Sequence, residues 1–158
     1  MEILSEKENQ ADHICQQGIE LCEADKYAEA HKLFQQAYTM SQSPKIISWL
    51  GYTTAIVENK VATGIQLCKK AIDSDVPDAL FYRNIGKLYL MQKNKRGAIG
   101  AFAKGLQIDK GNRSILKEWK VLGFRRRPFF PFLSREHKLN IIIGKFTWKQ
   151  ALKKQQKP

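Results

Sequence analysis

The sequence contains no long hydrophobic run. Nowhere in its 158 residues do apolar side chains approach the roughly 18 consecutive positions that a membrane-spanning helix needs. The first ten residues, MEILSEKENQ, are acidic and have no apolar core, so we do not expect a secretion signal there. Cysteines number only three, and Cys15 and Cys22 lie too far apart along one predicted helix to be bridged. We therefore expect free thiols and a cytoplasmic location.

Motifs for catalysis and for cofactor binding are also missing. The three histidines, His13, His31 and His137, fall in different predicted elements. His13 and Cys15 are two residues apart, and side chains at that spacing point away from each other on a helix, so they do not form a metal site. There is no glycine-rich phosphate loop and no nucleophile-elbow pattern. The sequence predicts a protein that is not an enzyme and has no cofactor or metal.

The clearest pattern is a pair of amphipathic helices in residues 79–112. Tyr82, Ile85 and Tyr89 recur at the spacing of one helix face, and Gly86 on that face permits close approach of a neighbouring helix. The polar residues at 93–95 separate this first helix from a second one that again has an apolar face. The turn-forming residues at 109–112 end the second helix. One helical hairpin cannot bury both of its faces, so it needs further copies.

The copies lie upstream at a constant step of 34 residues. Three columns repeat, namely Ala30/Gly64/Ala98, Phe34/Cys68/Phe102 and Ala37/Ala71/Gly105. With this period, residues 11–112 resemble three tetratricopeptide repeats. The resemblance implies an all-α fold, a solenoid of helical hairpins, and a function in binding other proteins. The middle copy departs from the pattern because Gly51 comes one residue early, which leaves the register of its first helix open by one residue.

The helix boundaries follow from capping and turn residues. Ser5 has the spacing of a capping box that opens the first helix, which should end near Glu23. We expect a second helix over 27–40 and a third that begins at Pro44, with Ser43 as its N-terminal cap. A fourth helix should cover 61–73, and two more should lie in residues 79–112. Asn112 should cap a seventh helix, over 113–123, which covers the open end of the solenoid. The predicted domains are therefore 1–123 and a C-terminal extension, 124–158.

Charge is distributed unevenly along the chain. Residues 1–43 carry 3 basic and 8 acidic groups, whereas residues 113–158 carry 13 basic and 2 acidic groups. The extension interleaves arginines with phenylalanines, and its prolines exclude a continuous helix at its start. It resembles the tails of small bacterial repeat proteins, a likeness that implies no activity. Its aromatic side chains favour packing on the repeats, while its basic groups could contact nucleic acid or anionic lipid. The candidate polyanion contacts are Arg125, Arg126, Arg127, Arg135, Lys145 and Lys149.

The family resemblance also implies where a partner binds. In tetratricopeptide repeats the first helix of each hairpin lines a concave groove, which here predicts a partner-binding set consisting of Cys15, Ile19, Trp49, Thr53, Arg83, Asn84 and Lys87. Trp49 could equally be a core residue. The resemblance also implies that the clamp for chaperone carboxyl termini is absent. That subclass has a set of Lys, Asn and Arg across its three copies, and the matching positions here hold Cys15, Ile19, Leu80 and Asn84. We expect an adaptor or scaffold that binds a protein or peptide in this groove. The alternative is a polyanion binder that uses the extension.

Overall fold

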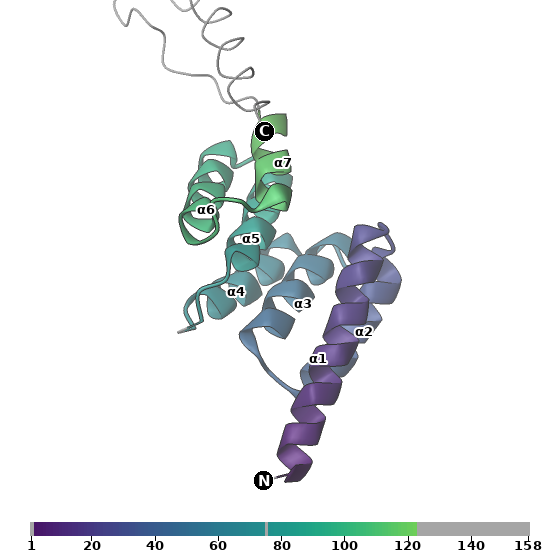
Figure 1. The fold of residues 1–158 in the computed structure, drawn as a ribbon. Helices are drawn as coiled ribbons and strands as arrows, with labels where there is room; N and C mark the ends of the chain where they lie inside the picture. The colour runs from purple at the N-terminus through teal and green to yellow at the C-terminus, as the bar shows by residue number, and fades with distance from the viewer. Residues whose placement is uncertain (1, 75, 123–158) are drawn as a thin grey trace, which may run out of the picture. The chain divides into compact units, whose positions relative to one another are not determined.

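The structure, a computed structural model, describes residues 2–74 and 76–122. That part of the chain consists of helices and the turns between them, with no strand (Figure 1). The helices are α1 (Glu2–Glu23), α2 (Tyr27–Met40), α3 (Pro44–Val57), α4 (Val61–Ile72), α5 (Ala79–Met91), α6 (Lys95–Ile108) and α7 (Arg113–Val121).

Three helical hairpins follow one another along the molecule. Helix α1 pairs with α2, α3 with α4, and α5 with α6, and the second helix of each hairpin packs on the first helix of the next. The first helices also contact each other, α1 with α3 and α3 with α5, and α7 packs on α5 and α6 (Figure 1). The predicted all-α hairpin solenoid with a final covering helix is confirmed.

The structural repeat keeps the 34-residue step in every copy. The first helices end at Glu23, Val57 and Met91, which are spaced by that step. Two residues after each of these ends, Asp25, Asn59 and Lys93 adopt left-handed backbone conformations with φ of 58°, 55° and 59°. Left-handed residues at one spacing in all three copies show that the middle copy is in register with the others, which resolves the question that Gly51 left open.

Gly51 marks a different packing solution in the middle hairpin. In the first copy, a Cβ atom on Gly18 would lie 2.8 Å from the ring of Phe34, and in the third, one on Gly86 would collide with the ring of Phe102. Each glycine therefore makes room for a phenylalanine of the second helix. In the middle copy the glycines at 51 and 64 face each other instead, and a Cβ on Gly51 would lie 2.7 Å from the carbonyl oxygen of residue 64.

The observed N-terminal helix caps agree with the predicted ones at some helices only. Asn112 caps α7 as predicted, since its side chain accepts a hydrogen bond from the Ile115 amide at 3.1 Å. The predicted capping box at Ser5 is wrong, because α1 already begins at Glu2. Ser43 lies at the cap position before Pro44, but its hydroxyl makes no capping bond. A proline at the first helical position supplies the helix start there without one.

Several predictions fall outside the described residues. These are the end of the covering helix at Gly123, the whole extension at 124–158, and with it the six candidate polyanion contacts. Within 2–74 and 76–122, none of the helices combines the length and the apolar character needed to cross a membrane.

Candidate functional site

A row of four aromatic rings runs between the first two repeats. Phe34 of α2 stacks on Trp49 of α3, with ring centroids 5.9 Å apart and ring planes 14° apart. Trp49 then meets Tyr52 edge to face at 6.0 Å, and Tyr52 meets Tyr27 of α2 edge to face at 6.1 Å. We call these four residues the aromatic row. Such stacked and edge-to-face pairs fix the relative position of the helices that carry them.

Two basic side chains of the third repeat lie over this row. Arg83 and Lys87 are four residues apart on α5 and therefore project from the same helix face. The guanidinium carbon of Arg83 lies 5.7 Å from the centroid of the Trp49 ring, and the Lys87 ammonium lies 5.1 Å from that of Tyr52. Both distances are within the range of cation–π attraction. The ammonium of Lys87 also pairs with the Glu118 carboxylate of α7 at 3.5 Å.

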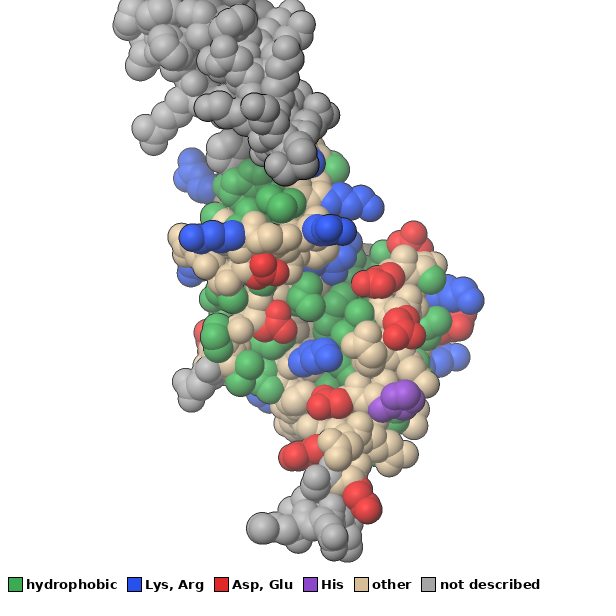
Figure 2. All heavy atoms as spheres, viewed as in Figure 1, with side chains coloured by type: hydrophobic (Ala, Val, Ile, Leu, Met, Phe, Trp, Pro, Cys, Tyr) green, Lys and Arg blue, Asp and Glu red, His purple; other side chains and the backbone are tan. Residues whose placement is uncertain are grey.

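These groups surround a pocket of about 80 Å³ on the face formed by the first helices. The same face appears in Figure 2, where hydrophobic side chains lie between α1 and the helices α5 and α7, with charged side chains on either side. We call this face, formed by α1, α3 and α5 and bounded by α7, the groove. The pocket is lined by Ile19, Cys22, Glu23, Tyr27, Trp49, Tyr52, Leu80, Arg83 and Ser114.

Burial keeps the cysteine and tyrosine side chains of the pocket wall neutral. It raises the pKa of the Cys22 thiol to about 12, although Arg83 and Lys87 partly oppose the shift. Burial likewise raises the pKa of Tyr52 to about 12 and that of Tyr27 further. A thiol held in its neutral form is a poor nucleophile and a poor metal ligand. Among the residues that the structure describes, no group of histidine, cysteine and carboxylate side chains is arranged to hold a metal ion.

The predicted partner-binding residues divide into two sets. Cys15, Thr53 and Asn84 are completely buried, and the last two form hydrogen bonds inside the core. The Thr53 hydroxyl donates to the Trp49 carbonyl at 3.0 Å, and the Asn84 amide donates to the Ser48 hydroxyl at 3.2 Å. Their side chains do not form the groove surface, because both are completely buried.

The remaining four predicted residues come together at the pocket or beside it. Ile19, Trp49 and Arg83 line it, and Lys87 lies over the adjoining Tyr52 ring. The sequence left open whether Trp49 faces the groove or belongs to the core. Its side chain is only 2% exposed, so it is a core residue. Arg83 and Lys87 are partly exposed and are the ones best placed to contact a partner.

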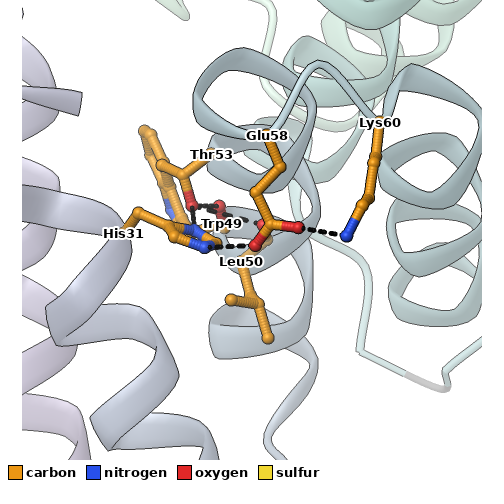
Figure 3. Close-up of polar contacts among 6 residues, drawn as sticks. All are labelled: His31, Trp49, Leu50, Thr53, Glu58 and Lys60. Atoms are coloured by element: carbon orange, nitrogen blue, oxygen red, sulfur yellow. Dashed lines mark hydrogen bonds and ion pairs between the residues drawn. The ribbon is translucent and has the colours of Figure 1, made fainter. Parts of the chain in front are cut away.

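A second polar cluster joins the first two repeats (Figure 3). His31 of α2 is buried, and its Nδ1 lies 3.0 Å from the Thr53 hydroxyl oxygen. Its Nε2 lies 2.9 Å from a carboxylate oxygen of Glu58, whose other oxygen accepts from Lys60 at 2.7 Å. Hydrogen bonds on both sides hold the imidazole in place, so this cluster connects the repeats instead of forming an open site.

Sequence reasoning missed several residues of the groove. Tyr52 occupies the position 34 residues after Gly18, where the other copies have glycine, and this replacement was a visible signal. Tyr27 was expected only as the start of the helix over 27–40. Glu118 belongs to the covering helix, which the repeat pattern places at the end of the solenoid and not at its groove. Cys22 and Ser114 carried no signal.

Comparisons with known proteins identify this arrangement. No family model and no curated protein sequence matches the chain. Several solved structures do match the chain. One is YrrB, described as a tetratricopeptide-repeat protein with an unusual peptide-binding site, with a TM-score of 0.55 at 18% sequence identity. The match covers 70% of this chain but only 57% of YrrB.

Two further structures match over most of their own length. The tetratricopeptide-repeat domain of Sgt2 from Aspergillus fumigatus has a TM-score of 0.58 at 16% identity, with coverage of 72% of this chain and 76% of that one. The Yersinia enterocolitica type III secretion chaperone SycD, in complex with a peptide of the translocator YopD, has a TM-score of 0.54 at 12% identity, with coverage of 72% and 87%. The described part of this chain has the tetratricopeptide-repeat fold.

Proposed function

We propose that this protein is a non-enzymatic adaptor that holds a segment of a partner protein in the groove of α1, α3 and α5. The observation that carries the proposal is the placement of Arg83 and Lys87 over the rings of Trp49 and Tyr52. Arginine, tryptophan and tyrosine are the residues that most often dominate the binding energy of protein interfaces. Here two helices from neighbouring repeats, α3 and α5, bring them together at the groove pocket.

The similar structures support the same class of function. SycD is described in complex with a translocator peptide, and YrrB is described as having a peptide-binding site. All three cysteines are free, which supports the proposed cytoplasmic location because unpaired thiols persist in a reducing environment.

Site-specific photocrosslinking tests the groove directly. Met91, at the end of α5, lies four residues after Lys87 and therefore on the same helix face. It is 44% exposed and can be replaced by a photoreactive amino acid without disturbing the core. The matched control is Gly100 of α6, whose added side chain would meet nothing within 4 Å. We expect the probe at Met91, and not the one at Gly100, to crosslink one defined protein, which is then purified for binding measurements.

The purified partner should lose affinity for an Arg83→Ala variant. Truncation of a central interface arginine typically weakens binding by about 2 kcal/mol or more, whereas Lys104→Ala on α6 should change it by less than about 0.5 kcal/mol. Equal crosslinking at both positions, or equal affinities of both variants, would show that the groove is not the binding surface.

A second candidate function is polyanion binding through the C-terminal extension. It is favoured by the 10 basic residues against 1 acidic one in residues 124–158. A labelled single-stranded RNA or an anionic vesicle should then bind with an affinity that falls steeply as salt rises. Replacement of Arg125, Arg126 and Arg127 by serine should reduce both the affinity and its salt dependence. Binding that is insensitive to salt and to these changes would exclude this function.

A further inference from the structure

Two buried N–H groups in the groove pocket have no hydrogen-bond acceptor among the described residues. They are the indole Nε1 of Trp49 and the Nε of Arg83. Both side chains line the same pocket, and the Arg83 guanidinium lies over the Trp49 ring. Because a buried donor without an acceptor destabilises the folded state, nearly all such groups in proteins are paired. Both residues therefore bring an unused donor to the wall of this pocket.

The geometry of Arg83 indicates which acceptor fits. Its Nη1 donates to the Asn84 side-chain oxygen at 3.4 Å, which leaves the opposite edge of the guanidinium, formed by Nε and Nη2. That edge can donate two parallel hydrogen bonds to a carboxylate. A carboxylate on it would therefore satisfy Nε and pair the charge at the same time.

The charges around the pocket also favour an anion. Lys87 is already paired with Glu118 at 3.5 Å, but none of the ion pairs in the described part of the chain includes Arg83. Glu23 also lines the pocket, yet it is exposed and forms no ion pair with Arg83. The apolar wall of Tyr27, Trp49 and Tyr52 lowers the local dielectric, which strengthens the attraction of a guanidinium for an anion.

We propose that this pocket binds the carboxylate of one aspartate or glutamate side chain in the segment that occupies the groove. The proposal rests on the protein-binding function given above and specifies its ligand chemistry. The volume of about 80 Å³ exceeds the roughly 10–15 Å³ that one water molecule requires. A single unpaired positive charge matches a monoanion better than a phosphate group, which carries about −1.5 to −2 at neutral pH.

Binding requires a small rearrangement of Arg83. Both unpaired nitrogens are hidden from solvent, while the Arg83 side chain as a whole is only partly buried. Rotation of this side chain away from the Trp49 ring exposes the indole N–H and turns the free guanidinium edge toward the pocket. The incoming carboxylate then accepts from both residues, and its methylene groups contact the aromatic row.

The test uses a random 12-residue peptide library displayed on phage and selected on the full chain. Recovered peptides are synthesised, and their position is established by crosslinking from Met91. We expect the groove-binding peptides to share one acidic residue whose change to Asn or Gln weakens binding roughly tenfold or more. Arg83→Gln should weaken the acidic peptide by a similar factor, and the two losses should not add, because both remove the same contact. Lys104→Gln is the matched basic control.

Two conservative variants separate recognition from folding. Arg83→Lys keeps the positive charge but removes the Nε donor and the forked edge, so it should also lose most of the preference for the acidic peptide. Trp49→Phe keeps a ring against Phe34 but removes the indole N–H, and it should reduce that preference in part. Each variant is compared with the wild type by circular dichroism and thermal unfolding.

The outcomes distinguish the two proposals. If peptides crosslink in the groove but bind equally well with Asn or Gln in place of the acidic residue, the carboxylate proposal is wrong and the groove function stands. If affinity is unaffected by all changes at Arg83, the pocket is not the recognition site. If no selected peptide crosslinks in the groove, the proposed function fails and the carboxylate proposal fails with it.

Discussion

The imidazole Nε2 of His31 lies 2.9 Å from Glu58 Oε1, although 27 residues separate the two along the chain. The contact ties the second helix of the first repeat to the turn that follows the first helix of the next repeat. The positions 34 residues further on hold Ile65 and Gln92, which cannot form such a pair. This polar junction therefore distinguishes the boundary between the first two repeats from the boundary that follows it.

Loss of the Glu58 carboxylate should change how stability depends on pH. The Lys60 ammonium, followed by the hydrogen bond from His31, lowers the pKa of Glu58 below its ordinary value of 4.5. Because the folded-state pKa lies below that of the unfolded chain, the carboxylate stabilises the fold above about pH 4.5, and this contribution disappears as the pH falls through the folded-state pKa. The stability difference between wild type and Glu58→Gln, measured by urea unfolding, should shrink between pH 6 and pH 3.

Glu29→Gln, at an exposed position of α2, is the control for this pH series. It should follow the wild-type pH dependence. A difference between wild type and Glu58→Gln that is constant from pH 6 to pH 3 would contradict the prediction.

Two glycine-to-alanine changes should act in opposite directions. A Cβ on Gly86 would collide with the buried ring of Phe102, so Gly86→Ala should destabilise the protein by about 1–3 kcal/mol. Gly100 lies on α6 with open space around its Cβ position, and Gly100→Ala should stabilise the protein by about 0.5–1 kcal/mol through higher helix propensity. Thermal and urea unfolding of the two variants measure both effects, and equal effects of the two changes would contradict the packing described here.

Removal of the α7 cap should weaken the covering helix. Asn112 accepts a hydrogen bond from the Ile115 amide, so Asn112→Ala should cost about 1 kcal/mol of stability. Hydrogen exchange should show the loss first in the amides of α7. Lys117→Ala, at an exposed position of the same helix, should leave exchange there unchanged within error.

The three thiols should react slowly in the folded protein. Burial raises the pKa of Cys15 to about 11 and those of Cys22 and Cys68 to about 12. Since only the thiolate is alkylated, iodoacetamide at pH 8 should modify the native protein at least roughly 100-fold more slowly than the urea-unfolded chain. Mass spectrometry counts the modified cysteines. Labelling of any cysteine at the unfolded rate would contradict its burial.

Most of the fold could be predicted from the sequence because the repeat carries the same packing requirement in each copy. Small residues at 18 and 86 face large ones at 34 and 102, and this pairing determines which helices form hairpins. The predicted helix over 27–40 matches α2. The helix register of the middle copy was harder to predict. Its two helices approach each other at Gly51 and Gly64, and Gly51 lies one residue before the position at which the other copies have their glycine.

The groove was predicted less completely because it depends on side-chain conformations. Helix periodicity places Trp49 on the side toward the groove but does not say whether its ring points outward or stacks on Phe34. The ring does stack, since burial against Phe34 and Tyr52 removes more apolar surface from water than exposure would. Glu118 was missed because its approach to Lys87 depends on how α7 packs against α5.

The ion pair between Lys87 and Glu118 would couple the affinity of the proposed groove for its partner to the docking of helix α7. Lys87 contacts the second repeat through Tyr52 and the last described helix through Glu118. Under the proposed function, a bound anion that also attracted Lys87 would compete with Glu118, and occupancy of the groove would then be linked thermodynamically to the docking of α7. Such a linkage would be reciprocal: undocking of α7 would change the affinity of the groove by the same free energy by which groove binding changes the docking of α7.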